Sequence, residues 1–315
     1  MKSNETILHV DHLYIQYSGL DVVRNASFDL KWGEILGIIG ESGCGKSTLI
    51  NAVLGLLDTQ GEVTNGSIQF FGQDITKMSV EELQQIRGKR ISAVFQNPGS
   101  TLNPIRKVKH QFYETLSAHG KCDKKAAEER ALDLLKKLNL PDPQRIMNSY
   151  PVQFSGGMNQ RIAIALAMAQ NPEIIIGDEL TSALDVTVQA QVVSELLHLK
   201  ENFSTAMIIV SHNMGMISYM ADTIAVMYAG EIVEYGAKDE IMNDPHHPYT
   251  KALIEAIPLP DGNLPEGLPG RRPNLGEYLD TCNFADRCRY CTSRCRKEAV
   301  ALRKLTDHHS VRCFI

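Results

Sequence analysis

Residues 40–47 have the types and the spacing of a loop that wraps around a chain of phosphates. They match the pattern G-x-x-x-x-G-K-[ST], in the order Gly40-Glu41-Ser42-Gly43-Cys44-Gly45-Lys46-Ser47. Glycines let the backbone curve closely, so that successive N–H groups point at phosphate oxygens, and a helix that starts there adds the positive end of its dipole. Lys46 is placed to reach the β- and γ-phosphates and Ser47 to ligate Mg²⁺, while Cys44 is a small spacer in the loop. The loop predicts a site for a nucleoside triphosphate.

Two acidic residues follow a second apolar run and would supply the rest of a hydrolytic site. Ile174–Ile176 and Gly177 lead into Asp178 and Glu179. A carboxylate at the tip of a strand can hold Mg²⁺ through its water shell, which fits Asp178. A second carboxylate can orient or deprotonate the attacking water, which fits Glu179. An isolated Asp-Glu pair is more often a solvated strand end, but together with the phosphate loop it favours nucleotide hydrolysis.

The elements that must position these residues follow from hydrophobic periodicity. Short strands are predicted over residues 6–30, and the phosphate loop joins an apolar strand at 34–39 to a helix at 46–57. Further along, apolar strands alternate with helices: strands at 174–176, 206–210 and 223–227, and helices at 162–169, 186–199 and 214–220. This rhythm predicts an α/β fold with a mostly parallel sheet that helices cover on both faces.

Composition and charge argue against several other classes of protein. The chain has 315 residues, 43% hydrophobic and 22% charged, so it is neither a disordered chain nor a small disulfide-stabilised domain. The net charge of −5 argues against a protein that coats DNA. The longest apolar run, Ile162–Ala169, is far shorter than the roughly 18 residues that span a bilayer, and residues 1–14 lack the pattern of a signal peptide. We therefore expect a cytoplasmic protein.

The composition changes sharply near Pro258. Residues 258–276 hold five prolines and four glycines, which is typical of a linker or an irregular extended segment. We expect a nucleotide-binding domain over residues 5–257 and a separate extension over residues 258–315.

Further motifs give the chain a resemblance to the ATP-binding-cassette (ABC) ATPases. Phe154–Arg161 resembles the signature motif of that family, and Ser182–Asp185 resembles its D-loop. Gln96 resembles the Q-loop glutamine, His212 the switch histidine, and Tyr17 the aromatic residue that stacks on adenine. The motifs occur in the family's order over roughly residues 5–240, which makes chance agreement negligible.

The resemblance implies a fold and a role for each motif residue. The fold would be a P-loop NTPase (RecA-like) core with an antiparallel β subdomain, a helical subdomain at about 97–170 and an irregular Cys-rich C-terminal extension. The catalytic residues would be Glu179, His212 and Gln96, and the Mg²⁺ ligands would be Ser47, Gln96 and Asp178. Nucleotide contacts are implied for a larger set: Tyr17, Gly40, Ser42, Gly43, Cys44, Gly45, Lys46, Ser47, Thr48, Asp178, Ser155, Gly156, Gly157, Met158 and Asp185.

The signature motif also implies a dimer. Ser155-Gly156-Gly157 at a helix start is a second anion-binding nest, but it cannot fold back onto its own phosphate loop. In the family it completes the ATP site of a partner subunit, so the working unit would be a head-to-tail dimer with ATP at the interface. Alone, Ser155 would most often be a plain helix cap and His212 an ordinary helix-start histidine. Their joint placement favours the functional interpretation.

Three features resemble the ATPases of oligopeptide and dipeptide importers: Thr101–Pro104, His247–Leu253 and the Cys-rich tail. They imply an ATP-hydrolysing subunit that energises peptide uptake from the cytoplasmic face of the membrane, as a peripheral protein. Its partners would be a second ATPase subunit, two transmembrane permease subunits and, indirectly, an extracytoplasmic substrate-binding protein. Met158 favours one of the two ATPase types that such importers pair, which points to a heterodimer. Relatives also carry nickel, opines or oligosaccharides, so the cargo stays open.

Some positions depart from the family, and one other class of function competes. Leu180, Asn159 and Val152 stand where Pro, Arg and His are usual, although none of these changes removes a catalytic group. The competing class is a soluble ABC ATPase that acts on nucleic acid or the ribosome. Repair-type members insert a long coiled coil between phosphate loop and signature, and Lys46 and Ser155 are too close for one. Translation-type members usually carry two cassettes per chain, so we expect no nucleic-acid partner.

Five of the seven cysteines lie in the last 34 residues. In a reducing compartment such crowding favours a metal site over disulfides. The pattern Cys282-x5-Cys288-x6-Cys295-x17-Cys313 resembles the one that holds a [4Fe–4S] cluster in some of these subunits, with Cys291 as a bystander. Zinc and free thiols are the alternatives, because Cys288-x2-Cys291 has zinc-like spacing. We expect the metal centre to stabilise the fold of the tail. We expect the phosphate loop to bind ATP even when the metal centre is lost.

Overall fold

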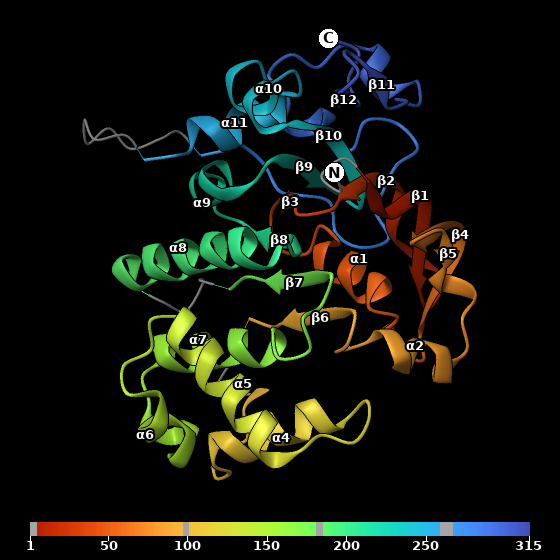
Figure 1. The fold of residues 1–315 in the computed structure, drawn as a ribbon. Coiled ribbons are helices and arrows are strands. Elements are labelled where there is room, and N and C mark those ends of the chain that lie inside the picture. Colours follow the sequence, from red (N-terminus) through yellow and green to blue (C-terminus); the bar gives the residue numbers. More distant parts are fainter. Residues whose placement is uncertain (1–4, 97–100, 181–184, 259–266) are drawn as a thin grey trace. The chain divides into compact units, whose positions relative to one another are not determined.

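The computed structural model describes residues 5–96, 101–180, 185–258 and 267–315. The chain divides into two compact units, whose elements are labelled in Figure 1. One unit contains Met78–Ile209, and the other contains the described residues up to Lys77 together with Val210–Ile315. The boundary expected near residue 258 stays a prediction.

An antiparallel sheet opens the second of these units. Its strands follow the order β2-β1-β4-β5: β2 (Leu20–Lys31), β1 (Thr6–Tyr17), β4 (Gly61–Phe70) and β5 (Gln73–Asp74). Ser18 and Gly19 join β1 to β2 with φ of 49° and 79°, the positive values that a tight two-residue hairpin turn requires. The strands predicted over residues 6–30 are confirmed.

The same unit contains a mixed group of strands. β3 (Ile35–Ile39) is buried along its whole length and runs parallel to β9 (Thr223–Tyr228). β9 turns back through Ala229 and Gly230, both at positive φ, into antiparallel β10 (Glu231–Ala237). The prediction of a mostly parallel sheet therefore holds for β3 and β9, whereas β10 extends the sheet in the opposite sense.

The C-terminal tail, residues 267–315, adds strands to this group. β12 (His309–Val311) pairs antiparallel with β10 and with β11 (Arg303–Lys304). The expectation of an irregular extension is thus wrong for these residues. The physical reason is that an unpaired strand edge exposes backbone donors and acceptors, and β12 satisfies those of β10.

Short helices complete this unit. They are α1 (Lys46–Val53), α9 (Met214–Met220), α10 (Lys238–Asn243), α11 (Pro248–Glu255) and the 3₁₀ turns η1 (Ile75–Lys77), η3 (Ala285–Arg287) and η4 (Arg294–Arg296). α9 packs directly on β3, because a Cβ atom on Gly37 would stand 2.4 Å from the Ile217 side chain.

The unit formed by Met78–Ile209 combines a parallel strand pair with a group of helices. β6 (Ile91–Val94) runs parallel to β7 (Ile174–Asp178), and β8 (Ala206–Ser211) follows β7 in the sheet order. The helices are α2 (Val80–Ile86), α4 (Val108–Ser117), α5 (Lys124–Lys137), α6 (Pro143–Asn148), α7 (Gly156–Ala167), α8 (Val186–Phe203) and the 3₁₀ turn η2 (Pro151–Gln153).

Helices α4–α7 contact one another, and in Figure 1 they form the yellow-to-green group. α5 shows why: its buried residues Ala127, Ala131, Leu134 and Leu135 recur at helical spacing along one face. The helical subdomain predicted at about 97–170 falls largely on these helices, although residues 97–100 lie outside the described part. Among the described helices, none combines the length and apolar character that crossing a membrane requires.

Candidate active site

The phosphate loop, residues 40–47, runs from the end of β3 to the first turn of α1. Gly43 and Gly45 adopt φ of 78° and 105°, a left-handed conformation that other residues rarely take. A Cβ atom on Gly40 would stand 2.2 Å from the carbonyl oxygen of Met227 on β9, so close packing also requires a glycine there. No side chain caps the start of α1 at Lys46. The backbone therefore has the shape of an anion-binding loop that opens a helix.

Lys46 lies inside this loop, with only 5% of its surface exposed. Its Nζ donates hydrogen bonds to the carbonyl oxygens of Gly40 at 2.7 Å and Glu41 at 3.0 Å. The ammonium group is thus held at the centre of the loop, where a phosphate oxygen can become its partner. Burial raises the pKa of the neighbouring Cys44 thiol, against the lowering effect of Lys46, so this thiol is not a reactive thiolate.

Glu41 of the loop is held by residues far along the chain. Its backbone N–H donates to the hydroxyl of Tyr249 on α11 at 2.9 Å. Its carboxylate accepts two hydrogen bonds from Arg287 at the end of η3, at 2.8 and 3.0 Å. Tyr249 is completely buried, and the Arg287 side chain is 7% exposed. The C-terminal tail therefore contacts the phosphate loop directly.

Two other predicted residues lie in the same unit. Tyr17 ends β1, and its ring lies across Gly61, where a Cβ atom would stand 2.6 Å from the ring. His212 is exposed and follows the last residue of β8, directly before Asn213, which caps α9. Tyr17 is thus the last residue of a strand and His212 directly follows one, and at least part of each residue is accessible.

The acidic pair and the Q-loop glutamine lie together in the other unit. Asp178 ends β7, and the next residue, Glu179, adopts a φ of 48°, a conformation that is strained for a residue with a side chain. Gln96 Nε2 donates to a Glu179 carboxylate oxygen at 3.1 Å. Leu180, which stands where proline is usual, is 2% exposed and packs over Gly177. The Glu179 carboxylate is thus fixed by Gln96 in a turn that directs it away from regular strand geometry.

The signature residues begin helix α7. The Ser155 hydroxyl caps the helix by accepting from Met158 N at 3.4 Å, and Ser155 and Gly156 are both exposed. Gly157 is buried because Val188 of α8 lies where its Cβ would be, at 2.5 Å. Asp185 caps α8 by accepting from Val188 N at 3.0 Å. The remaining D-loop residues, Ser182 to Leu184, lie outside the described part of the chain.

The four cysteines predicted as cluster ligands lie around one small cavity. Its lining includes Cys282, Cys288, Cys295 and Cys313, together with apolar residues such as Phe284 and Val300, but it does not include Cys291. Burial raises the pKa of Cys282 to about 12, and the neighbouring cysteines add to the shift. All seven cysteines are free thiols. Among the residues that the structure describes, no group of three or more His, Cys, Asp or Glu side chains is placed to hold a metal ion.

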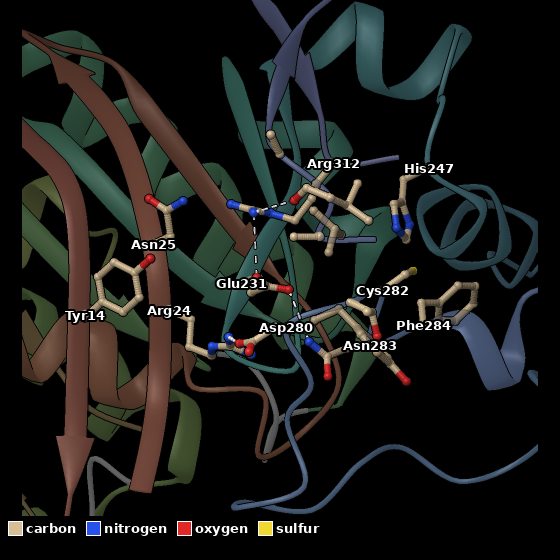
Figure 2. A pocket seen from close by; sticks show the side chains of 16 residues that line it. Tyr14, Arg24, Asn25, Glu231, His247, Asp280, Cys282, Asn283, Phe284 and Arg312 are labelled. Carbon is tan, nitrogen blue, oxygen red and sulfur yellow. Dashed lines mark hydrogen bonds and ion pairs between the residues drawn. The ribbon is translucent and has the colours of Figure 1, made fainter. Parts of the chain in front are cut away.

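A second, larger cavity of 370 Å³ lies between the tail and the strands beneath it, and Figure 2 shows its lining. Arg24 on β2 forms an ion pair with Asp280 at 2.6 Å, and Arg312 forms one with Glu231 on β10 at 3.7 Å. Asn283 also donates to Glu231, at 3.3 Å. Of the described residues in this lining, none belongs to the predicted nucleotide contacts. The ion pairs and the hydrogen bond in this cavity hold the tail against β2 and β10.

Comparison with known proteins agrees with these motifs. A family model described as "ABC transporter" matches residues 23–182. The chain is 38% identical over 313 residues to the dipeptide transport ATP-binding protein DppD of Escherichia coli, covering 98% of this chain and 96% of that protein. The chain belongs to the ABC transporter family. With this result, the resemblance inferred from the sequence and the prediction of an ABC-type ATPase are confirmed.

Further matches of this ABC protein extend into the tail and to solved structures. A model described as "Oligopeptide/dipeptide transporter, C-terminal region" matches residues 233–295. The oligopeptide transport ATP-binding protein OppD of Haemophilus influenzae is 40% identical over 309 residues, covering 96% of this chain and 94% of that protein. The dimeric post-hydrolysis structure of the ATP-binding cassette MJ0796, bound to ADP and Pi, matches with a TM-score of 0.65 and 28% identity, over 73% of this chain and 98% of that one.

The predicted ATP-site residues of this ABC subunit divide between the two compact units. Tyr17, the phosphate loop and His212 belong to one unit, whereas Gln96, the acidic pair and the signature residues belong to the other. The sequence places Arg287 among basic residues near the cysteines, but it does not predict the contact of Arg287 with the phosphate loop or any role for Tyr249. The signal for Tyr249 is the run His247–Leu253, which in the sequence indicates only a family likeness.

Proposed function

We propose that this ABC protein is the ATP-hydrolysing subunit of an importer for dipeptides or oligopeptides. The observation that carries the proposal is the match of both parts of the chain: the cassette itself and the oligopeptide/dipeptide-type C-terminal region. The relatives named above are ATP-binding proteins of dipeptide and oligopeptide transport, and their similarity runs through nearly the whole chain.

In the proposed reaction, residues of the phosphate loop bind ATP. The loop N–H groups receive the phosphate oxygens, Lys46 binds the β- and γ-phosphates, and Tyr17 stacks on the adenine. The Ser47 hydroxyl, the Asp178 carboxylate and the Gln96 amide are oxygen ligands of the kind that Mg²⁺ prefers. Bound there, Mg²⁺ would neutralise charge that develops on the phosphates.

Hydrolysis is assigned to Glu179 and His212. Glu179 would orient and deprotonate the attacking water, and its hydrogen bond from Gln96 supports this role because it fixes the carboxylate. His212 would contact the γ-phosphate or the water. Gln96 connects this chemistry to the helical subdomain that follows it in sequence, and we propose that this subdomain transmits the ATP state to the membrane subunits.

The partners follow from the same proposal. Ser155 and Gly156 are exposed at the start of α7, which supports their binding to the ATP of a second ATPase subunit in a head-to-tail dimer. Two transmembrane permease subunits would form the channel, with an extracytoplasmic binding protein delivering the peptide. The subunit would then work at the cytoplasmic face of the membrane.

We also propose that Cys282, Cys288, Cys295 and Cys313 hold a [4Fe–4S] cluster that stabilises the fold of the tail. Support comes from the cavity that these four thiols share, which Cys291 does not line. Because no described group is placed for a metal ion, the proposal rests on this shared cavity and on the spacing. Anaerobically purified protein should then contain about four irons per chain, retained in Cys291→Ser and lost in Cys295→Ser. One zinc and no iron would contradict it.

The transport proposal is tested by reconstitution. The chain, its second ATPase subunit and its permease subunits would be placed in lipid vesicles with the peptide-loaded binding protein. We expect peptide uptake that requires ATP and is lost in His212→Ala, because that change removes a contact to the γ-phosphate or the water. Uptake of nickel or a sugar in place of peptide would correct the cargo, and stimulation by nucleic acid or ribosomes instead of the binding protein would refute the transport role.

A further inference from the structure

The contact between the tail and the phosphate loop has a geometry that ordinary surface ion pairs lack. Arg287 uses all of its guanidinium nitrogens: Nη1 and Nη2 bind the Glu41 carboxylate, Nη1 also faces the Tyr228 hydroxyl at 3.4 Å, and Nε donates to the carbonyl oxygen of Pro269 at 3.0 Å. The side chain is 7% exposed. By contrast, the tail pair Arg294–Glu298 is more than half exposed on both sides. The Glu41 side chain is 30% exposed, so the contact is partly buried as well as two-pronged. Such a contact fixes the position of its partner better than an exposed single-bonded pair does.

Glu41 connects Arg287 to Lys46 of the phosphate loop. Its side chain is held by Arg287, its N–H by Tyr249, and its carbonyl oxygen accepts from Lys46 Nζ. A change in the position of Glu41 therefore moves the backbone to which Lys46 is bonded. Glu41 is the second residue of the phosphate loop. A shift of Glu41 would therefore also move the backbone N–H groups of the loop residues that follow it.

The tail approaches the loop at a second point. A Cβ atom on Gly43 would stand 3.2 Å from the Arg272 guanidinium, so this side chain lies against the loop backbone. Arg272 and Arg287 both belong to the segment 267–287, which also pairs Arg24 with Asp280. The tail thus contacts the phosphate loop at two points, Arg287 at Glu41 and Arg272 at Gly43.

We propose that Arg287 is a positioning residue for ATP binding: by holding Glu41 it keeps the phosphate loop in the form that accepts the nucleotide, so that the fold of the tail sets the ATP affinity of its own subunit. This inference rests on the proposed ATPase function. The residue does not touch the nucleotide in this scheme, and its effect reaches ATP through Glu41.

The test compares four variants of the full chain in the assembled transporter. Arg287→Met removes the contact, Arg287→Lys keeps the charge without the planar fork, and Glu41→Gln removes the partner charge. Arg294→Met is the control, because it breaks an exposed ion pair of the same tail, with Glu298, and it also removes the guanidinium that lies 4.1 Å from the centre of the Phe314 ring. For each variant, KM for ATP, kcat and the equilibrium binding of ATP are measured, together with hydrogen exchange of the peptide that contains residues 40–47.

We expect Arg287→Met to raise KM and the dissociation constant for ATP by about tenfold, which lies within the usual range of coupling between sites, and to leave kcat at saturating ATP unchanged. Hydrogen exchange of the loop should accelerate in Arg287→Met. For Arg287→Lys, KM and the dissociation constant for ATP should lie between those of Arg287→Met and the unmodified chain. For Arg294→Met, both constants should equal those of the unmodified chain. Because both residues act through one contact, Glu41→Gln combined with Arg287→Met should be no worse than Arg287→Met alone.

Two results would overturn the inference: unchanged ATP affinity in both Arg287→Met and Glu41→Gln, or additive effects of the two changes. If Arg287→Met does not fold, Glu41→Gln still tests the same contact with the tail arginine in place. Failure of the proposed function is distinguishable, because it appears in the unmodified chain as loss of ATP-dependent peptide uptake, whereas failure of this inference leaves that uptake intact and leaves ATP affinity the same in the variants.

Discussion

Replacing Glu234 by alanine should detach the tail from the sheet beneath it. Glu234 lies on β10 and is completely buried. Its carboxylate accepts hydrogen bonds from the backbone N–H groups of His246 at 2.6 Å and His247 at 3.0 Å, and it is 2.8 Å from Nε2 of His309 on β12. One side chain therefore joins β10, the start of α11 and the tail.

The magnitude follows from the donors that lose their acceptor. In Glu234→Ala two backbone N–H groups and one imidazole face a cavity, and each unpaired buried donor costs about 1–3 kcal/mol. Allowing for relaxation and partial hydration, we expect a loss of about 3–5 kcal/mol in the free energy of unfolding, a large part of the roughly 5–15 kcal/mol of a typical domain. Glu234→Gln keeps one acceptor oxygen and should lose less.

The assay is urea unfolding followed by the fluorescence of Trp32, the single tryptophan, which lies in the unit that contains the tail. Glu298→Gln is the control, because Glu298 belongs to an exposed tail pair worth about 0–1 kcal/mol. A loss below about 1 kcal/mol in Glu234→Ala would refute the reasoning, since it would mean that water satisfies these donors as well as the carboxylate does.

Three further changes test the site and its supports. Lys46→Ala should abolish productive ATP binding, measured by titration with a fluorescent ATP analogue, and unchanged affinity would refute the loop assignment. Tyr249→Phe leaves the Glu41 N–H without its acceptor, at a cost of about 1–3 kcal/mol, so hydrogen exchange at Glu41 should accelerate; unchanged exchange would contradict the contact. Burial, opposed by Arg161, raises the pKa of Glu195 to about 7 from 4.5. Because the folded pKa is the higher one, ionising Glu195 is costly in the folded state. The free energy of unfolding should therefore be highest below pH 4.5 and fall as the pH rises to about 7, by an amount that solvent screening keeps below about 3 kcal/mol, and Glu195→Gln should remove that fall.

The phosphate loop could be predicted from the sequence because its constraints are local. Gly43 and Gly45 have positive φ, and α1 begins at Lys46, so each requirement of the motif falls on the residue that carries it. The strand before Asp178 could be predicted in the same way, since a short apolar run followed by acidic residues is typical of a buried strand with a solvated end.

The supports of the loop could not be predicted because they join distant segments. Arg287 and Glu41 are 246 residues apart, and Tyr249 and Glu41 are 208 apart. No periodicity or spacing pattern encodes such a pair. Even the run His247–Leu253 indicated only a family likeness, whereas the structure shows that its tyrosine hydroxyl binds the loop.

The tail was the least predictable part. β12 has only three residues, His309, Ser310 and Val311, which is too short for an alternating pattern to stand out from the polar sequence around it. Its pairing with β10 depends on Glu234 and His309, which are 75 residues apart. The four spaced cysteines line one small cavity, and the metal centre that their spacing suggests stays a prediction.

Phosphate release by Glu179→Gln in the assembled transporter tests the ATPase mechanism most directly. The amide keeps the shape of the side chain but cannot act as a base, so the variant should bind ATP as tightly as the unmodified chain and release no phosphate above background. The unmodified complex, measured beside it, should release phosphate when the peptide-loaded binding protein is added. Phosphate release by Glu179→Gln at the rate of the unmodified complex would contradict the account, because the base would then lie elsewhere.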